Sequence, residues 1–197
     1  MKRWLQRVSG PALDFLFPPV CTGCGKLGYS ICPGCRAAVV PIVDSDCRIC
    51  NRHLDVADIC GSCNAKTHNL ERVYAAAVYS GPLREAIGRL KYRNHRFLSS
   101  SLGDLLVRRL RVQQLEGFTL IPVPLHRRRK KSRGYNQSEI LAKYVSELLD
   151  LPLDTDGPER VRDTESQVGR SESDRRRNVR GAFPPRKSSS PASLFCS

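Results

Sequence analysis

Eight of the nine cysteines in this 197-residue chain form four C-x-x-C pairs between residues 21 and 63. Each such turn lets two thiolates point at one metal ion, and two turns complete a tetrahedral site of four sulfurs. The spacing therefore predicts two closed, structural zinc sites, because no coordination position stays open for water. The expected ligands are Cys21, Cys24, Cys32, Cys35, Cys47, Cys50, Cys60 and Cys63.

The gaps between the pairs indicate how they combine. Seven residues separate the first pair from the second and nine separate the third from the fourth, whereas eleven lie between the second and the third. These gaps favour sequential pairing, with Cys21 to Cys35 on one zinc and Cys47 to Cys63 on the other. An interleaved pairing stays open at this point.

Whether paired cysteines bind metal or form disulfides depends on whether the protein resides in a reducing or an oxidising compartment. The basic N-terminal stretch contains Ser9, Gly10, Pro11 and Asp14, which interrupt the apolar core that a signal peptide needs. No run of about 18 apolar residues is present to span a membrane. We therefore expect a cytoplasmic protein without a membrane partner, in which paired cysteines bind metal.

The chain is strongly basic, with a formal net charge of +14. Two zinc ions on eight thiolates would reduce this to about +10, so the excess of positive charge persists. Such a balance favours anionic partners, such as nucleic acid, phosphorylated metabolites or an acidic protein, without selecting one of them.

After Cys63 the pattern becomes α/β. Residues 73–79 are expected to form a buried strand, and 118–124 a second one. Helices are expected after Gly81-Pro82, over 97–110, and from a cap at Asn136 or Ser138. A capping box from Ser171 to Asp174 predicts a short basic helix or turn. The apolar faces of the longer helices are Leu83, Ile87 and Leu90; Leu98, Leu102, Leu105 and Leu106; and Ile140, Leu141, Tyr144, Val145 and Leu148.

Six basic residues follow the second strand, in an expected loop from His126 to Arg133. A strand, a basic loop and a helix N-terminus in succession suit phosphate binding, because open α/β sheets bind ligands beyond the carboxyl ends of their strands. A solvated cationic loop without a ligand is the alternative.

The chain resembles the ComF family, which joins an N-terminal double zinc ribbon to a type I phosphoribosyltransferase domain. The resemblance rests on L-F-P-P-V-C-T-G-C-G from residue 16, on residues 83–98, on 121–145, on R-V-R-D-T-E-S-Q from residue 160 and on 175–183. Its most specific part is the occurrence of R-G-Y-N-Q at 133–137 in the same chain as the cysteine pairs. The implied fold class is α/β, with a Rossmann-like parallel sheet flanked by helices.

The resemblance also implies a site for phosphoribosyl diphosphate, with Mg²⁺ required only when that ligand binds. Competence links the family to DNA uptake, and thereby to single-stranded DNA and a helicase as partners. The substrate-binding residues implied in this way are Arg133, Gly134, Asn136, Gln137, Arg162, Thr164, Gln167, Arg176 and Asn178. Arginine suits this task because its planar guanidinium meets phosphate oxygens bidentately.

The sequence departs from the family pattern in one respect: it contains no D-D-x-x-T-T-G segment to hold the ribose hydroxyls and the 5′-phosphate. We therefore expect a phosphoribosyltransferase-like domain that is incomplete and inactive as an enzyme, through truncation, an altered reading frame or a natural short form. The expected divisions are an N-terminal helical segment (1–17), the double zinc ribbon (18–68), the incomplete domain (69–183) and a disordered Pro/Ser-rich tail (184–197).

Two functions follow. One is a ComF-type phosphoribosyltransferase-like protein linked to DNA uptake. The other is a zinc-ribbon adaptor that binds single-stranded nucleic acid or a protein partner through its basic surface. Catalytic residues are not assigned under either hypothesis.

Overall fold

A computed structural model of the chain describes residues 18–42, 47–55, 58–65, 70–184 and 193–196. The chain divides into two compact units, Met1–Gln113 and Gln114–Ser197. The boundary expected at residue 68 therefore lies inside the first unit, and the expected helix in 1–17 lies outside the described residues. Within the described part, no helix is long and apolar enough to cross a membrane.

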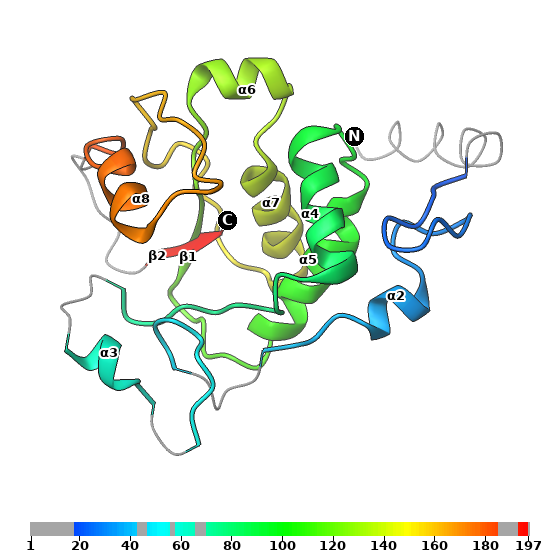
Figure 1. Ribbon diagram of the computed structural model, residues 1–197, viewed down its shortest axis with the longest axis horizontal. Helices are drawn as coiled ribbons and strands as arrows, with labels where there is room; N and C mark the ends of the chain where they lie inside the picture. Colours follow the sequence, from blue (N-terminus) through cyan, green and yellow to red (C-terminus); the bar gives the residue numbers. More distant parts are fainter. Residues whose placement is uncertain (1–17, 43–46, 56–57, 66–69, 185–192, 197) are drawn as a thin grey trace. The chain divides into compact units, whose positions relative to one another are not determined.

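The described part of the first unit contains two short helices and two longer ones. The short helices are α2 (Pro33–Ala37) and α3 (Gly61–Asn64), and each begins directly after a cysteine. The longer α4 (Gly81–Tyr92) and α5 (Leu98–Leu110) pack against each other (Figure 1). Both were predicted from their apolar periodicity. Their buried hydrophobic side chains are Leu83, Ala86, Leu90, Leu98, Leu102, Val107 and Leu110, while Ile87, Leu105 and Leu106 are half-buried.

The strand predicted over 73–79 is not formed. Residues 72–77 are half-buried and extended, but they pair with residues 40–42 through one antiparallel bridge, between Pro41 and Ala77. Two hydrogen bonds flank the bridge, from Ile42 N to Ala76 O at 3.3 Å and from Val78 N to Val40 O at 2.9 Å. The alanines at 75–77 supply little side-chain surface for a larger sheet, which explains why an apolar run alone misled the prediction.

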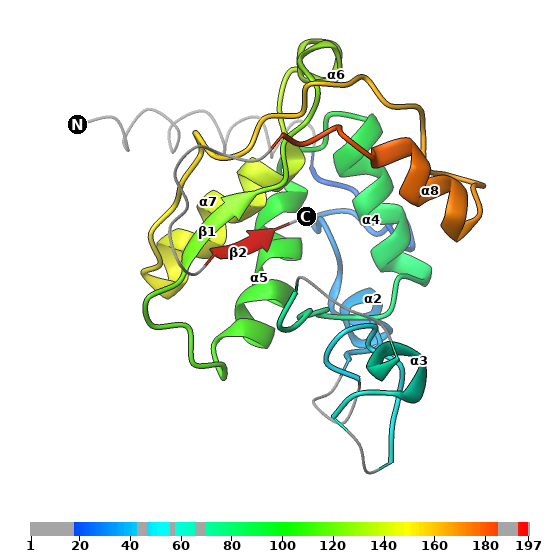
Figure 2. The same ribbon diagram turned by 90° about the vertical axis from the view of Figure 1, so that its left-hand side faces the viewer.

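The second unit has a small parallel sheet at its centre. Strand β1 (Thr119–Pro122) is shorter than the predicted 118–124 and pairs in parallel with β2 (Ser193–Cys196), as Figure 2 shows. The other edge of β1 accepts residues 152–154, which follow α7 (Gln137–Leu149), through hydrogen bonds on both sides of Leu120. A strand, a helix and a parallel segment in succession form the crossover typical of α/β folds.

Strand β2 corrects the expectation of a disordered tail for residues 193–196, which form a strand in register with β1. The Pro/Ser composition of the tail hid a four-residue run, Ser193-Leu194-Phe195-Cys196, that is too short to show a period of two. Residues 185–192 and 197 lie outside the described part of the chain.

The basic segment predicted as a loop is instead helix α6 (Arg127–Arg133), which ends at Gly134 with φ 77°. Arginine and lysine are good helix formers, and a left-handed glycine is a common helix terminator. The like charges are offset by carboxylates outside the helix. The ion pairs are Arg127–Glu159 at 3.7 Å, Arg128–Asp163 at 3.9 Å, Arg129–Asp163 at 3.5 Å and Lys130–Glu139 at 3.2 Å.

The N-terminus of α7 is capped by Asn136 rather than by Ser138. The Asn136 Oδ1 accepts a 3.0 Å hydrogen bond from the backbone N–H of Ser138, and its Nδ2 donates at 3.0 Å to the carbonyl of Val123. This buried side chain thus joins the end of β1 to the start of α7. Along α7 the predicted Leu141 and Val145 are buried, but Leu148 is 46% exposed, and Ala142, which was not predicted, is fully buried.

The two bonds of Asn136 can be separated by mutation. We expect Asn136→Ala to lower the opening free energy of α7 by about 1–2 kcal/mol, because both the cap and the tie to Val123 are lost. Asn136→Asp keeps the cap and should lose less. Hydrogen exchange of the α7 amides measures the opening free energy in both variants. The matched control is Gln114→Ala, which removes an exposed side-chain amide. Equal protection in Asn136→Ala and in the wild type would contradict this role.

Candidate metal centres and anion site

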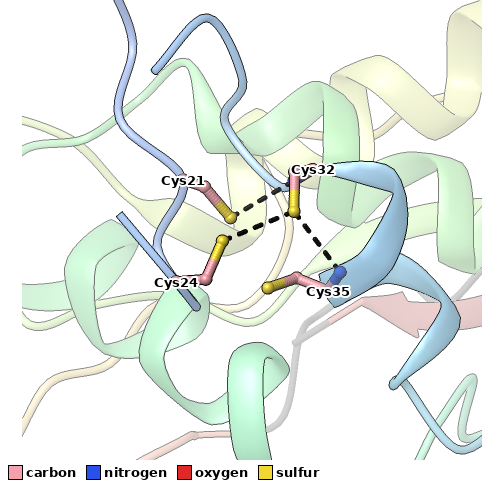
Figure 3. Close-up of side chains that lie close together, drawn as sticks. All are labelled: Cys21, Cys24, Cys32 and Cys35. Atoms are coloured by element: carbon pink, nitrogen blue, oxygen red, sulfur yellow. Dashed lines mark hydrogen bonds between the residues drawn. The ribbon is translucent and has the colours of Figure 1, made fainter. Parts of the chain in front are cut away.

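The cysteines gather in two groups of four: Cys21, Cys24, Cys32 and Cys35, and Cys47, Cys50, Cys60 and Cys63. In each group all four sulfurs lie within 4.8 Å of one another, and in the first they point toward one another (Figure 3). The grouping is sequential, and the interleaved pairing is not formed. All eight cysteines are free thiols in the structure, so the alternative of a disulfide framework is not formed either.

Both groups are built in the same way. In each, the first cysteine pair lies on a turn closed by two backbone hydrogen bonds, from Cys21 N to Lys26 O and Gly25 N to Cys21 O in the first group. The second group repeats them as Cys47 N to Arg52 O and Asn51 N to Cys47 O. Gly25 and Asn51 occupy the same left-handed position, with φ 80° and 55°. The two ribbons are thus structural repeats of each other.

The second pair of each group begins a helix. Cys32 is the N-cap of α2 and Cys60 is the N-cap of α3. Their backbone N–H groups donate to Cys21 Sγ at 3.2 Å and to Cys47 Sγ at 3.4 Å. Positive ends of backbone dipoles favour thiolate over thiol, which is the form that binds metal.

The ionisation of the thiols reflects this geometry. Burial opposes the ionisation of Cys21, but hydrogen bonds from backbone N–H groups, that of Cys32 foremost, lower the pKa of its thiol to about 6. The N–H of Cys60 is the main cause that lowers the pKa of Cys47 to about 6. Burial, and then the neighbouring thiols, raise the pKa of Cys35 and of Cys63 to about 12. Four sulfurs at one place therefore cannot all ionise without a cation among them.

The sulfur geometry fits zinc. Tetrahedral bonds of about 2.3 Å place sulfurs about 3.8 Å apart. The Sγ atoms of Cys24 and Cys32 lie 3.5 Å apart, and those of Cys50 and Cys60 lie 3.7 Å apart. The two clusters therefore fit two structural zinc ions, each of which would neutralise its thiolates and join two chain segments.

A second candidate site lies in the second unit, beyond the carboxyl end of β1. The guanidinium of Arg129 donates to the carbonyl of Thr164, and that of Arg160 donates to its hydroxyl. Thr164 is only 4% exposed. Burial, and then the charge of Arg129, lower the pKa of Arg160. Two cations thus converge where an anion would relieve their repulsion.

Asp163 is the carboxylate beside these arginines. Its Oδ1 lies 3.5 Å from Arg129 Nε and 3.6 Å from His126 Nδ1. One carboxylate against several cations leaves a positive excess, so the site suits an anionic ligand.

The residues implied by the family resemblance have various roles here. Gly134 ends α6 and Asn136 caps α7, so both serve the backbone. Arg133 donates to Gln137 one turn later. Thr164 lies at the convergence of the arginines, and Gln167 has a buried Oε1 without a hydrogen-bond partner in the described part of the chain.

The remaining residues of that set lie along 162–180. Arg162 donates to the carbonyl of Arg180, Arg176 pairs with Glu172 at 2.6 Å, and Asn178 donates to the carbonyl of Glu165 at 3.0 Å. These contacts hold the segment in place, and that of Asn178 reaches the residue that follows Thr164. Sequence reasoning included Arg129 only as one member of the basic segment 126–133, and it did not select Arg160 or Asp163.

Gly23 offers a test of the first metal centre. A Cβ at this position would lie 2.6 Å from Cys35 Sγ and 2.9 Å from Pro82 Cβ. We therefore expect Gly23→Ala to displace Cys35 and to lose the metal of the first cluster while the second keeps its own. Gly34→Ala is the matched control, because a Cβ there meets nothing within 4 Å. Metal analysis by native mass spectrometry distinguishes the two variants, and full zinc content in Gly23→Ala would contradict the geometry.

Comparison with known proteins agrees with these features. Residues 12–64 match the family model of the double zinc ribbon domain. The chain is 32% identical to Competence protein F of Haemophilus influenzae over 78% of this chain and 69% of the relative. It is 31% identical to the DNA utilization protein YhgH of Escherichia coli K12 over 91% of this chain and 75% of the relative.

A more distant relative is Competence protein ComFC of Bacillus subtilis, which is 26% identical over 64% of this chain and 54% of its own length. No solved structure matches the chain significantly. The double zinc ribbon and the extent of similarity to Competence protein F and YhgH together show that this chain belongs to the ComF family.

Proposed function

We propose that this protein serves DNA uptake or utilization in the cytoplasm, and that its second unit binds a phosphorylated ligand of the phosphoribosyl diphosphate type. The printed names of its relatives, which refer to competence and to DNA utilization, support the first part. The observation that carries the second part is the convergence of Arg129 and Arg160 on the buried Thr164.

The position of this convergence suits a phosphoribosyltransferase-like unit. The arginines lie in α6 and in the segment before α8 (Glu172–Val179), beyond the carboxyl end of a strand in a parallel sheet. Parallel α/β sheets bind ligands at this end of their strands. A diphosphate offers several oxygens to two guanidinium groups, and Mg²⁺ would then accompany the ligand.

The proposal concerns binding alone. The sequence contains no D-D-x-x-T-T-G segment, whose carboxylates and turn hold the ribose and its 5′-phosphate in phosphoribosyltransferases. We therefore expect this chain to hold the diphosphate part of the ligand more firmly than the sugar. Inorganic pyrophosphate and phosphoribosyl diphosphate should bind with similar affinity.

Titration calorimetry with pyrophosphate and Mg²⁺ tests the anion site. We expect Arg129→Ala and Arg160→Ala each to weaken binding about tenfold or more, because a charge-assisted hydrogen bond is lost in a partly buried place. Arg160→Lys keeps the charge but not the planar geometry, so its affinity for pyrophosphate should lie between that of the wild type and that of Arg160→Ala. The matched control is Arg175→Ala, an exposed arginine of α8. An equal loss in the control would show attraction by net charge only, and would contradict the site.

A second candidate function is single-stranded nucleic-acid binding by an adaptor, and a specific observation in the first unit favours it. At the end of α4 and the start of α5, Tyr92 is 72% exposed and Phe97 is 46% exposed, next to Arg93 and Arg96. Exposed aromatic rings among basic side chains are typical of surfaces that stack bases and attract phosphates.

This candidate predicts an affinity for oligothymidine that falls steeply with salt, because counterions are released on binding. We expect Tyr92→Ala to weaken that affinity about tenfold through lost stacking. Tyr79→Ala is the control, since Tyr79 is 60% exposed but lies outside this basic segment. Fluorescence anisotropy at several salt concentrations measures both effects. A slope near zero, or equal effects of the two substitutions, would contradict the adaptor function.

A further inference from the structure

The first unit contains a cavity of about 330 Å³ that neither the zinc clusters nor the proposed anion site uses. Its apolar wall is formed by the paired extended segments 39–42 and 76–77 and by the C-terminal half of α5. Val39, Ile42, Leu105 and Val112 contribute aliphatic surface. A hollow of this size lies within the range that proteins use to bind small groups and side chains.

The cavity is also strongly cationic. Arg36, Arg108 and Arg109 line it together with the aliphatic residues. Asp104 lies beside one of these arginines, with its Oδ2 3.9 Å from Arg36 Nη2. This exposed pair is long, so it neutralises little of the charge. The cavity therefore joins an apolar wall to an excess of positive charge.

The arginines are positioned to different degrees. The guanidinium of Arg109 lies 5.6 Å from the ring centroid of Tyr74, a cation–π contact that holds its direction. Arg108 is exposed, and the structure describes no ion pair or hydrogen bond of its side chain. An exposed guanidinium beside an apolar wall is available to a carboxylate of a partner.

The chemistry of the cavity selects among anionic partners. None of its lining residues is aromatic, so bases of a nucleic acid would find no ring to stack on. A free phosphate would not use the aliphatic wall. A peptide with an aliphatic side chain between carboxylates would use both the wall and the arginines, because interfaces combine a buried apolar anchor with a polar rim.

We propose that this cavity, which we call the arginine cavity (Arg36, Val39, Ile42, Leu105, Arg108 and Arg109), docks an acidic segment of a partner protein through an aliphatic anchor side chain. The carboxylates on either side of the anchor pair with Arg108 and with Arg36. Docking here is separate from binding of a phosphorylated ligand, because the arginine cavity belongs wholly to the first unit.

The zinc-loaded full chain is the reagent for the test. The probe is a fluorescein-labelled peptide in which leucine alternates with glutamate, and anisotropy reports its binding. One comparison peptide has serine in place of leucine, and another has lysine in place of glutamate. We expect only the first peptide to bind, because the serine peptide lacks the anchor and the lysine peptide is repelled by the arginines.

Variants of the chain locate the binding. Arg108→Glu should weaken the peptide about tenfold or more, whereas Arg84→Glu, the same change on the exposed side of α4, should have less than about a twofold effect. Val112→Ser removes exposed aliphatic surface from the cavity, and Val168→Ser is its control in the second unit. Neither exposed position is part of the core, so folding is retained.

Three results would overturn the proposal. If Arg108→Glu and Arg84→Glu weaken peptide binding equally, the peptide is attracted by the net charge of the protein and not by the cavity. Equal binding of the leucine and serine peptides would show that the apolar wall does not contribute to binding. Displacement of the leucine peptide by oligothymidine, with loss of oligothymidine binding in Arg108→Glu, would assign the cavity to nucleic acid instead.

Discussion

The crowding of four sulfurs at each of two points is the constraint on which the first unit depends. Neutral thiols would accept only weak hydrogen bonds from the backbone N–H groups that point at them, and four thiolates without a cation would repel one another. A divalent cation satisfies both conditions. In the described part of the second ribbon, the hydrophobic side chains packed against the cysteine cluster are Ile49, Leu54 and Ile59, which is a small apolar core. Segments of this size rarely stay folded without a metal or disulfides.

The clusters also explain the local sequence around them. Gly23 is fixed by the approach of Cys35 Sγ and Pro82, and Gly25 and Asn51 by their left-handed backbone. Pro82 opens α4, so the packing at Gly23 connects the first cluster to the α4–α5 helix pair of the same unit. The arginine cavity depends on the same chain segments, because Arg36 lies in α2, between the cluster and residues 39–42. The first cluster and the proposed docking site thus share helix α2.

Much of this arrangement could be predicted from the sequence, for a physical reason in each case. The spacing of metal ligands along the chain reflects the geometry of the site, so the two cysteine groups and their sequential order could be predicted. Helices α4, α5 and α7 follow from a period of 3.6, and the cap at Ser171 from a capping box. Helix α6 was missed because charge dominated the interpretation, while the stabilising partners Glu159 and Asp163 lie far along the chain. The convergence of Arg129 and Arg160 on Thr164 depends on the same long-range contacts, and the arginine cavity on packing between segments, which no local pattern reveals.

X-ray absorption at the zinc edge tests the central claim, that thiolate-bound zinc organises the first unit, most directly. We expect two zinc ions per chain, each with four sulfurs at about 2.3 Å and no nitrogen or oxygen neighbour. Substitution of a sulfur by a lighter ligand at about 2.0–2.1 Å would contradict the closed four-cysteine sites. A protein that gives no absorption at the zinc edge would also contradict the claim, because the ribbons would then be folded without zinc.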